Sequence, residues 1–182
     1  MPSSKFKDIF WSITDIVGTI AVAVAAVLVI RTFIVQPFLV SGESMEPNFA
    51  HGDYLIVDEL SYRFQEPKRG DVVVFEHDSE SFFIKRIMAV PGETIAVRSG
   101  KVRILQDGEW SVLQEPYVMP SRTFGDFEVN LGPDEFFVMG DNRNLSFDSR
   151  RWGPLQRSNI VGLVRLRLWP LVTAQAISSP AY

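Results

Sequence analysis

The chain has 182 residues, of which 46% are hydrophobic, and a formal net charge of −4. This length predicts one domain of ordinary size with an appendage, and the absence of a long basic stripe argues against a nucleic-acid partner. There is no cysteine, and the two histidines, His51 and His77, are far apart in the sequence. Disulfides, thiol catalysis and thiolate metal sites are therefore excluded, and no metal centre or cofactor is expected.

The first element in chain order is a long apolar run. Residues 16–30 read IVGTIAVAVAAVLVI and contain no charge. At ~1.5 Å per residue, a helix over residues 13–33 has about the length that crosses the hydrocarbon core of a bilayer. A cleavable signal peptide is the alternative, because residues 21–25 contain two Ala-x-Ala patterns. We favour a retained single-pass anchor, since the apolar residues continue well beyond those patterns.

The residues before the run bear on its orientation. Lys5 and Lys7 lie in the tail of residues 1–12 and favour a cytoplasmic N-terminus under the positive-inside rule. On that interpretation, the rest of the chain lies on the far side of the membrane.

A serine loop, Ser41-Gly42-Glu43-Ser44-Met45-Glu46-Pro47, follows the apolar run. Gly42 permits a positive φ, and Pro47 fixes its own φ and restricts its neighbour, so this segment is expected to turn. A serine in such a loop is most often a plain turn residue. The loop alone therefore does not predict catalysis.

The remainder of the chain is rich in β-branched and aromatic residues between short turn signals, which is typical of strands. The predicted strands are 53–57, 71–76, 81–90, three short strands in a meander over 95–113, then 127–131, 136–139 and 161–169. We expect 127–131 and 136–139 to form a hairpin, and the small, polar tail from Thr173 to be disordered or lightly packed. These patterns predict an all-β, antiparallel body behind a single N-terminal transmembrane helix.

A serine nucleophile needs a base, for which the candidates are His51, His77 and a lysine. His51 lies in a turn sequence, and His77 ends a strand beside acidic residues, where a hydrated side chain is expected. Lys85 lies in the middle of an apolar strand. It fits an edge strand whose cations face solvent, or a buried site where desolvation lowers the lysine pKa enough to make a base.

A third group of polar residues forms the stretch from Gly140 to Gly153, which reads GDNRNLSFDSRRWG. Such a loop is usually held by side-chain hydrogen bonds and Asp–Arg pairs, so a structural role is the default. A hydroxyl from this loop could also orient Lys85.

Together these stretches resemble a bacterial-type signal peptidase I (leader peptidase), a membrane-anchored endopeptidase with a Ser-Lys dyad. The blocks that carry the resemblance are Ser41–Pro47, Gly52–Leu55, Arg69–Phe75, Lys85–Gly92 and Gly140–Gly153. Five blocks in the same order behind an apolar anchor make the resemblance specific.

The resemblance implies a role for each matching residue. Ser44 would be the nucleophile and Lys85 the general base, Ser146 would hydrogen-bond and orient Lys85, and the backbone N–H of Ser44 would serve the oxyanion hole. Some family members place a further oxyanion-binding serine two residues before the nucleophile. This chain has Gly42 there, so a second donor is not identified.

The resemblance also implies a substrate site and a topology. Pockets for small residues at positions −1 and −3 of the cleavage site would be lined by Phe38, Val40, Met45, Phe49, Phe83 and Ile84. Structural charge partners around the site would be Arg86, Asp141, Asp148 and Arg150. The β-rich catalytic domain would span 34–172, with a variable hairpin insert at 94–130 and a tail at 173–182.

The implied partners are the lipid bilayer, of either a plasma or a thylakoid membrane, and preproteins that carry signal peptides. Two alternatives differ in class. One is a related Ser-Lys self-cleaving protein, such as the autoproteolytic domain of certain repressors, against which the anchor and the lack of a DNA-binding segment count. The other is a non-catalytic β-module tethered to a membrane.

Overall fold

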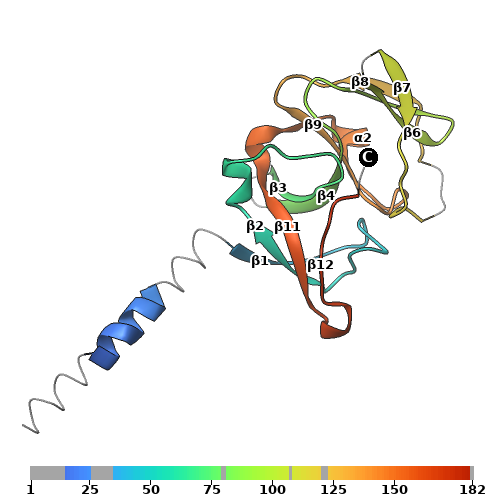
Figure 1. The fold of residues 1–182 in the computed structure, drawn as a ribbon. Helices are drawn as coiled ribbons and strands as arrows, with labels where there is room; N and C mark the ends of the chain where they lie inside the picture. The colour runs from blue at the N-terminus through green and yellow to red at the C-terminus, as the bar shows by residue number, and fades with distance from the viewer. Residues whose placement is uncertain (1–14, 26–34, 79–80, 107, 120–122, 181–182) are drawn as a thin grey trace, which may run out of the picture.

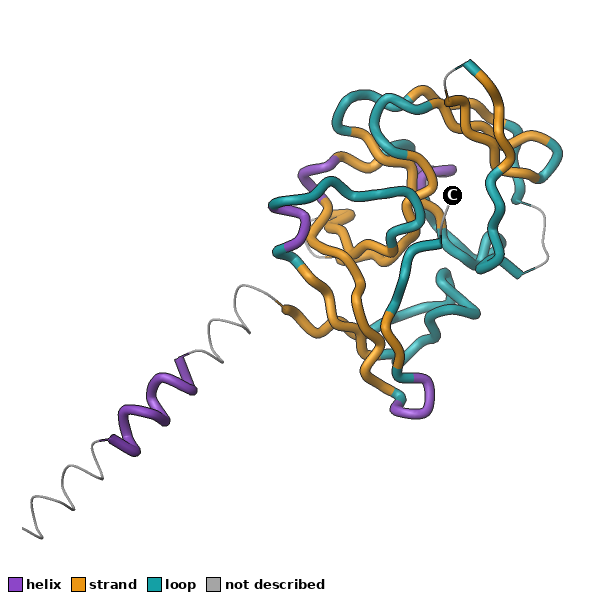
Figure 2. Tube along the Cα trace, viewed as in Figure 1, coloured by secondary structure: helices purple, strands orange, loops and turns teal. Residues whose placement is uncertain are grey.

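The computed structural model describes residues 15–25, 35–78, 81–106, 108–119 and 123–180 of the chain. Residues 15–25 are helical, and antiparallel strands make up most of the regular structure from residue 35 onward (Figures 1 and 2). The prediction of an all-β, antiparallel body is therefore confirmed. Among the described residues, no helix combines the length and apolar character needed to cross a bilayer. The predicted anchor, residues 13–33, lies partly outside the described residues.

The larger sheet contains strand β4, on which four predicted site residues lie: Phe83, Ile84, Lys85 and Arg86. Its strands, in spatial order, are β1 (Val35–Leu39), β2 (Tyr54–Asp58), β11 (Ile160–Trp169), β3 (Val72–Asp78), β4 (Ser81–Ala89), β9 (Glu135–Met139) and β10 (Leu155–Gln156), and β12 (Gln175–Ala176) pairs with β11. Strand β4 lies between β3 and β9, with Lys85 opposite Val73. Lys85 is thus in an interior strand, and the edge-strand interpretation was wrong.

The smaller sheet has the order β7-β6-β5-β8. Its strands are β5 (Thr94–Arg98), β6 (Lys101–Gln106), β7 (Glu109–Val112) and β8 (Phe127–Asn130). The first three form the predicted meander. The predicted hairpin of 127–131 with 136–139 was wrong, because β8 pairs with β5 whereas β9 belongs to the larger sheet. The four residues between β8 and β9 carry the chain from one sheet to the other, and the sheet that each strand joins is decided by non-local pairing.

Short helical elements connect the strands. They are the 3₁₀ helices η1 (Ser61–Arg63), η2 (Arg157–Asn159) and η3 (Leu171–Thr173) and the α-helix α2 (Ser149–Trp152). Helix α2 begins after Asp148, whose carboxylate accepts a hydrogen bond from the backbone N–H of Arg150, as expected of an N-cap aspartate. None of these elements was predicted, since each is about one turn long.

The serine loop, which continues in the structure as turn and bend to Phe49, is fixed to the core by two of its own side chains. Met45 and Phe49 are 1% and 2% exposed and pack in a cluster with Leu55, Val57 and neighbouring valines of the larger sheet. Full burial of a side chain of this size contributes about 1.5–3 kcal/mol. The burial of these two side chains therefore anchors the loop that presents Ser44 to the core of the larger sheet.

The C-terminal tail pairs with the larger sheet through β12 and is otherwise mostly exposed, which agrees with the light packing that was one of its two expected states. Ala176 pairs with Leu166 of β11, and Ile177 packs partly buried against the cluster beneath the serine loop. The backbone N–H of Ile177 donates to Arg165, and Ser179 Oγ donates to the carboxylate of Asp71. Backbone pairing and one partly buried isoleucine hold the tail, and neither is evident from its small, polar composition.

Candidate active site

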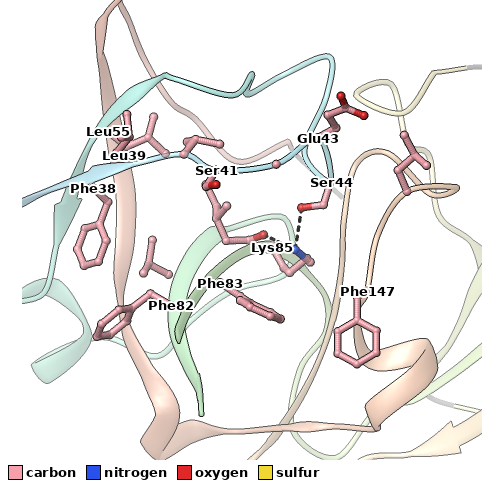
Figure 3. Close-up of a pocket in the computed structure, with 15 residues that line it drawn as sticks. Phe38, Leu39, Ser41, Glu43, Ser44, Leu55, Phe82, Phe83, Lys85 and Phe147 are labelled. Carbon is pink, nitrogen blue, oxygen red and sulfur yellow. Dashed lines mark hydrogen bonds between the residues drawn. The ribbon is translucent and has the colours of Figure 1, made fainter. Parts of the chain in front are cut away.

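Ser44 and Lys85 lie in direct contact. Nζ of Lys85 donates a hydrogen bond of 2.8 Å to Ser44 Oγ and another of 2.9 Å to the carbonyl of Ile84 (Figure 3). Ser44 is presented by the serine loop, in which Gly42 has a φ of +97°. A side-chain-bearing residue is strained at that angle, so the glycine allows the turn that the sequence predicts.

The environment of Lys85 raises the fraction of the amine that is neutral. The residue is only 4% exposed, and this burial lowers the pKa of the amine to about 8, against the opposing charges of Asp148 and Asp141. About one-tenth of such an amine is neutral at pH 7, compared with roughly one in 3,000 at the ordinary lysine pKa. The pair can therefore act chemically as a hydroxyl nucleophile with an amine base.

Ser146 lies beside the nucleophile's backbone. A Cβ built on Gly140 would stand 2.3 Å from Ser146 Oγ and 2.4 Å from the carbonyl oxygen of Ser44, so both groups crowd the same point. Among the described residues, buried Ser146 Oγ has no hydrogen-bond partner, and the expected bond to Lys85 is not formed. The hydroxyl lies near Asp148 and helps to lower the pKa of that carboxyl without reaching ordinary hydrogen-bond geometry.

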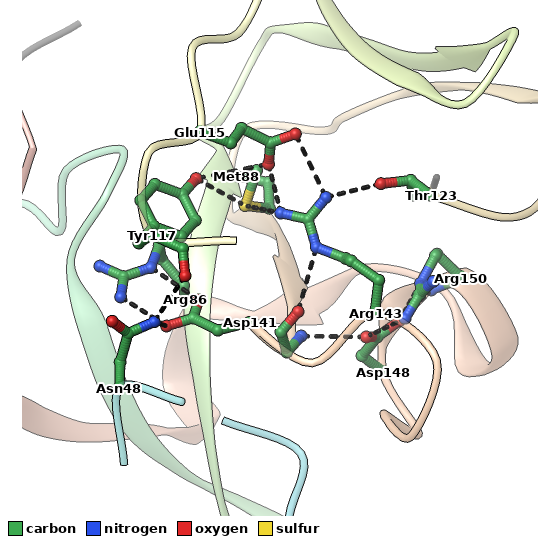
Figure 4. A network of polar contacts seen from close by, with 11 residues as sticks. Asn48, Arg86, Met88, Glu115, Tyr117, Thr123, Asp141, Arg143, Asp148 and Arg150 are labelled. Carbon is green, nitrogen blue, oxygen red and sulfur yellow. Dashed lines mark hydrogen bonds and ion pairs between the residues drawn. The ribbon is translucent and has the colours of Figure 1, made fainter. Parts of the chain in front are cut away.

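Two ion pairs, drawn in Figure 4, contain the aspartates whose charges act on Lys85. Arg86 binds Asp141 through two hydrogen bonds of 2.8 and 2.7 Å, and both side chains are at least 95% buried. Arg150 likewise donates two hydrogen bonds to the carboxylate of Asp148, of 2.8 and 2.7 Å, in a bidentate pair. Burial alone would raise the pKa of Asp148, but Arg150 and the N–H of Gly140 hold it below its usual value. The four residues predicted as charge partners thus form two pairs.

The dyad opens into a cavity of about 430 Å³ with mainly apolar walls. It is lined by Phe38, Leu39, Val40, Ser41, Gly42, Glu43, Ser44, Leu55, Val74, Phe82, Phe83, Ile84, Lys85, Leu145 and Phe147. Four of the six predicted pocket residues are in this set, whereas Met45 and Phe49 lie in the core beneath. Strand periodicity could have found Phe82, since it shares a face with Ile84.

Neither histidine hydrogen-bonds Ser44 among the described residues. His51 is exposed, and its Nδ1 accepts a hydrogen bond of 3.3 Å from the N–H of Gly42. His77 is half-buried and stacks on Phe83 with ring centroids 4.6 Å apart, so the expected hydrated side chain was wrong. The described residues also contain no group of three or more His, Asp or Glu side chains that could hold a metal ion.

Comparison with known proteins places these residues in a family context. The profile of the family described as signal peptidase, peptidase S26, matches residues 13–169. Signal peptidase I of Leptolyngbya laminosa is 38% identical over 85% of this chain and 79% of its own length. A probable signal peptidase I of Synechocystis is 35% identical over 93% of this chain and 89% of its own. Thylakoidal processing peptidase 1 of Arabidopsis thaliana is 34% identical over 81% of this chain and 46% of its own.

Proposed function

The chain belongs to the signal peptidase family S26, as a signal peptidase I, and from this premise we propose that it removes signal peptides from preproteins by a Ser44–Lys85 dyad. The family membership supports the activity. The observation that supports the residues is the 2.8 Å hydrogen bond between Lys85 Nζ and Ser44 Oγ in a buried environment. A hydroxyl and an amine at this distance can exchange a proton without rearrangement.

The reaction follows from the two groups. Ser44 Oγ attacks the scissile carbonyl carbon while neutral Lys85 takes the hydroxyl proton. The tetrahedral intermediate then collapses, and the lysine ammonium gives its proton to the departing amine, which leaves an ester on Ser44. Water attacks this ester with Lys85 again as base, and the lysine returns the proton to Ser44 Oγ as the free signal peptide forms.

Ser146 assists by confining the amine. Its hydroxyl is buried, has no hydrogen-bond partner among the described residues and lies beside the Ser44 backbone, so it is available to accept a hydrogen bond from Lys85 when the two side chains approach each other during the reaction. Hydrogen bonds of catalytic groups are often long in a free enzyme and tighten with substrate. The role that family resemblance suggests for Ser146 is therefore retained as part of this proposal.

The oxyanion hole would use the backbone N–H of Ser44. Within the described residues no protein acceptor takes this N–H, which leaves it free to bind the developing negative charge. One such donor typically accounts for about 3 kcal/mol in the transition state. Gly42 offers no side-chain hydroxyl, so a second donor has to come from another group.

The apolar cavity suggests how the substrate is chosen. Phe38, Val40, Phe83 and Ile84 surround the dyad with large side chains, which leaves room for small residues in the substrate next to the cleaved bond. Cleavage after small residues at positions −1 and −3 follows as part of the proposal. Burial of small apolar groups is worth only about 1–3 kcal/mol per site, so selectivity would come from steric exclusion of larger ones.

The site of action would be a membrane surface. The uncharged run at residues 16–30 has the composition of a membrane anchor, and Lys5 and Lys7 before it favour a cytoplasmic N-terminus. The catalytic body of residues 34–172 would then lie on the opposite side, where the ends of signal peptides leave the bilayer. The plasma membrane is proposed, with the thylakoid membrane as the alternative that the Arabidopsis relative suggests.

Cleavage of a purified preprotein by the full chain in detergent micelles tests this function. Ser44→Ala and Lys85→Met are both expected to abolish cleavage while keeping the folded near-ultraviolet spectrum. Ser158→Ala and Lys68→Met make the same chemical changes at exposed positions and are expected to leave the rate unchanged. Wild-type cleavage by either dyad variant would refute the assignment, and loss of activity in the exposed variants would point to general instability.

A further inference from the structure

Residues 115–117 form a segment that contacts each of the three stretches of chain that carry Ser44, Lys85 and Ser146. After β7 the chain leaves the smaller sheet, and residues 115–117, Glu115, Pro116 and Tyr117, are here called the strap; Figure 4 shows Glu115 and Tyr117 beside Arg143 and Arg86. None of the three residues lines the cavity that contains Ser44 and Lys85. The strap lies in the 94–130 region, for which the sequence predicted no catalytic role.

The first contact is with the serine loop. Nδ2 of Asn48 donates a hydrogen bond of 2.7 Å to the carbonyl of Tyr117 and one of 2.9 Å to the carboxylate of Asp141. Asn48 lies in the same loop as Ser44, directly before buried Phe49. Its amide therefore joins the loop of the nucleophile to both the strap and the Asp141 region.

The second contact is with the strand of the base. The guanidinium carbon of Arg86 lies 4.1 Å from the ring centroid of Tyr117, within cation–π range. Arg86 is next to Lys85 in β4 and holds Asp141 on its other side. Further along the same strand, Met88 Sδ accepts a hydrogen bond of 3.7 Å from Tyr117 Oη.

The third contact is with the loop that carries Ser146. The side chain of Arg143 is fully buried and pairs with the Glu115 carboxylate. It also donates to Thr123 Oγ1 at 2.7 Å and to the carbonyl of Gly140 at 3.1 Å. Glu115 in turn accepts a hydrogen bond of 3.4 Å from Tyr117 Oη, so the strap is internally connected.

We propose that the strap is a positioning element, which sets the relative placement of Ser44, Lys85 and Ser146 from outside the substrate site. The three catalytic groups lie on three separate segments, so their relative positions depend on non-covalent contacts between those segments. A displacement of about 1 Å of one group relative to another can lower the rate 10²-fold. The strap supplies one segment to which all three are attached by side-chain contacts. This inference rests on the proposed function, because it assigns the smaller sheet a part in that reaction.

A positioning role differs measurably from general support of the fold. Arg86 neutralises Asp141, and the charge of Asp141 raises the pKa of Lys85 against the effect of burial. Loosening Arg86, or admitting water behind β4, moves the pKa of Lys85 upward in both cases. A purely structural defect would lower the amount of active enzyme equally at every pH, with no shift of the pH profile.

The test compares kcat, KM and the acid limb of kcat/KM for Tyr117→Ala, Tyr117→Phe and Glu115→Gln in the full chain with a signal-peptide substrate. Tyr117→Ala is expected to lower kcat at least 30-fold, to change KM less than threefold, and to shift the acid limb to higher pH. Glu115→Gln is expected to lower kcat in the same manner. Tyr117→Phe keeps the ring over Arg86 and is expected to retain most of the activity, and Gln114→Ala, at an exposed neighbour, all of it.

The outcomes separate this inference from the function on which it rests. Full kcat and an unshifted acid limb in folded Tyr117→Ala would overturn the strap while leaving the dyad intact, as would a rise in KM alone. Cleavage by Ser44→Ala would remove the dyad and the strap together. If Tyr117→Ala does not fold, Tyr117→Leu fills most of the same volume without the aromatic face and is expected to show the same loss of kcat and the same shift.

Discussion

The backbone N–H of Asn142 donates a hydrogen bond of 3.0 Å to the carbonyl oxygen of Ser44. This bond ties the loop of Ser146 to the nucleophile's own peptide group. Gly140, two residues earlier, makes the approach possible, because a Cβ at that position would lie 2.4 Å from the same carbonyl oxygen. Real Cβ contacts are essentially never that short, so a larger residue at position 140 must push the two loops apart.

Gly140→Ala is therefore expected to lower kcat/KM by about 10²-fold or more, since it displaces Ser44 and Ser146 relative to Lys85. Steady-state cleavage of a signal-peptide substrate measures the effect. Gly132→Ala is a matched control: its Cβ would meet only the flexible end of Glu135, at 3.3 Å, and activity should stay within twofold. Wild-type activity in Gly140→Ala would mean that the close packing of the two loops is not needed for catalysis.

The buried ion pair between Arg86 and Asp141 leads to a stability prediction. Asp141→Asn removes the carboxylate that binds Arg86 at a site where the arginine side chain is 5% exposed, and it should lower the free energy of unfolding by about 3–5 kcal/mol. The pair Arg98–Glu128 is about half exposed on each side, so Glu128→Gln should cost at most about 1 kcal/mol. Urea unfolding of the two variants measures the contrast, and equal losses would contradict it.

Local sequence patterns were sufficient for most of the strands. Alternation and turn signals predicted the bounds of β2, β3, β4 and β11 to within two residues at each end, because these features are encoded within each segment. They did not predict the partners of β8 and β9, nor the pairing of β12 with β11. These depend on which distant strand offers a free edge, and a single sequence does not encode that locally.

For the site, the sequence predicted the two catalytic residues but not all of the pocket wall or the strap. The motif resemblance brought Ser44 and Lys85 together across 41 positions, which periodicity alone could not do. The same resemblance put Met45 and Phe49 on the pocket wall, although the turn of the serine loop directs them into the core. The strap could not be predicted, because Glu115 and Tyr117 act through contacts with Arg143 and Arg86 that only the fold creates.

The packing of the C-terminal tail gives a third prediction. Ile177→Ala removes a partly buried side chain from the cluster beneath the serine loop and should cost roughly 1–2 kcal/mol of unfolding free energy. Gln175→Ala, at an exposed position of β12, should change stability by no more than about 0.5 kcal/mol. Thermal or urea unfolding distinguishes the two. Identical stability of the Ile177 variant and the wild type would mean that the tail does not pack in solution.

The pKa of Lys85 gives a prediction for the pH dependence of activity. Because burial lowers this pKa to about 8, the acid limb of kcat/KM should report an apparent pKa near 8 and fall about tenfold per pH unit below it. Lys85→Arg cannot lose its proton in this range and should be inactive at every pH. An acid limb near 10.5 would show that the lysine is not desolvated, and one near 6.5 would bring the histidines back as candidates for the base.

The same pKa predicts how stability depends on pH. Between about pH 8 and 10.5 the unfolded chain keeps a proton on Lys85 that the folded chain has lost, so the free energy of unfolding rises with pH across this window. The whole effect is about 3 kcal/mol, and below pH 8 it remains as a constant cost of burying the charge. Lys85→Met, of similar length and uncharged, removes that cost.

Lys85→Met should therefore be inactive but more stable than the wild type at pH 7, by up to about 3 kcal/mol. Its advantage should shrink as the pH is raised from 8 towards 10.5, because the wild-type lysine is then neutral in both states. The difference between the two proteins isolates Lys85 from every other titratable group, because both chains share all of the others. Lys68→Met, at an exposed lysine, should have the stability of the wild type at every pH. If the difference in unfolding free energy between Lys85→Met and the wild type does not change with pH, the pKa of the Lys85 amine is not lowered in the folded enzyme.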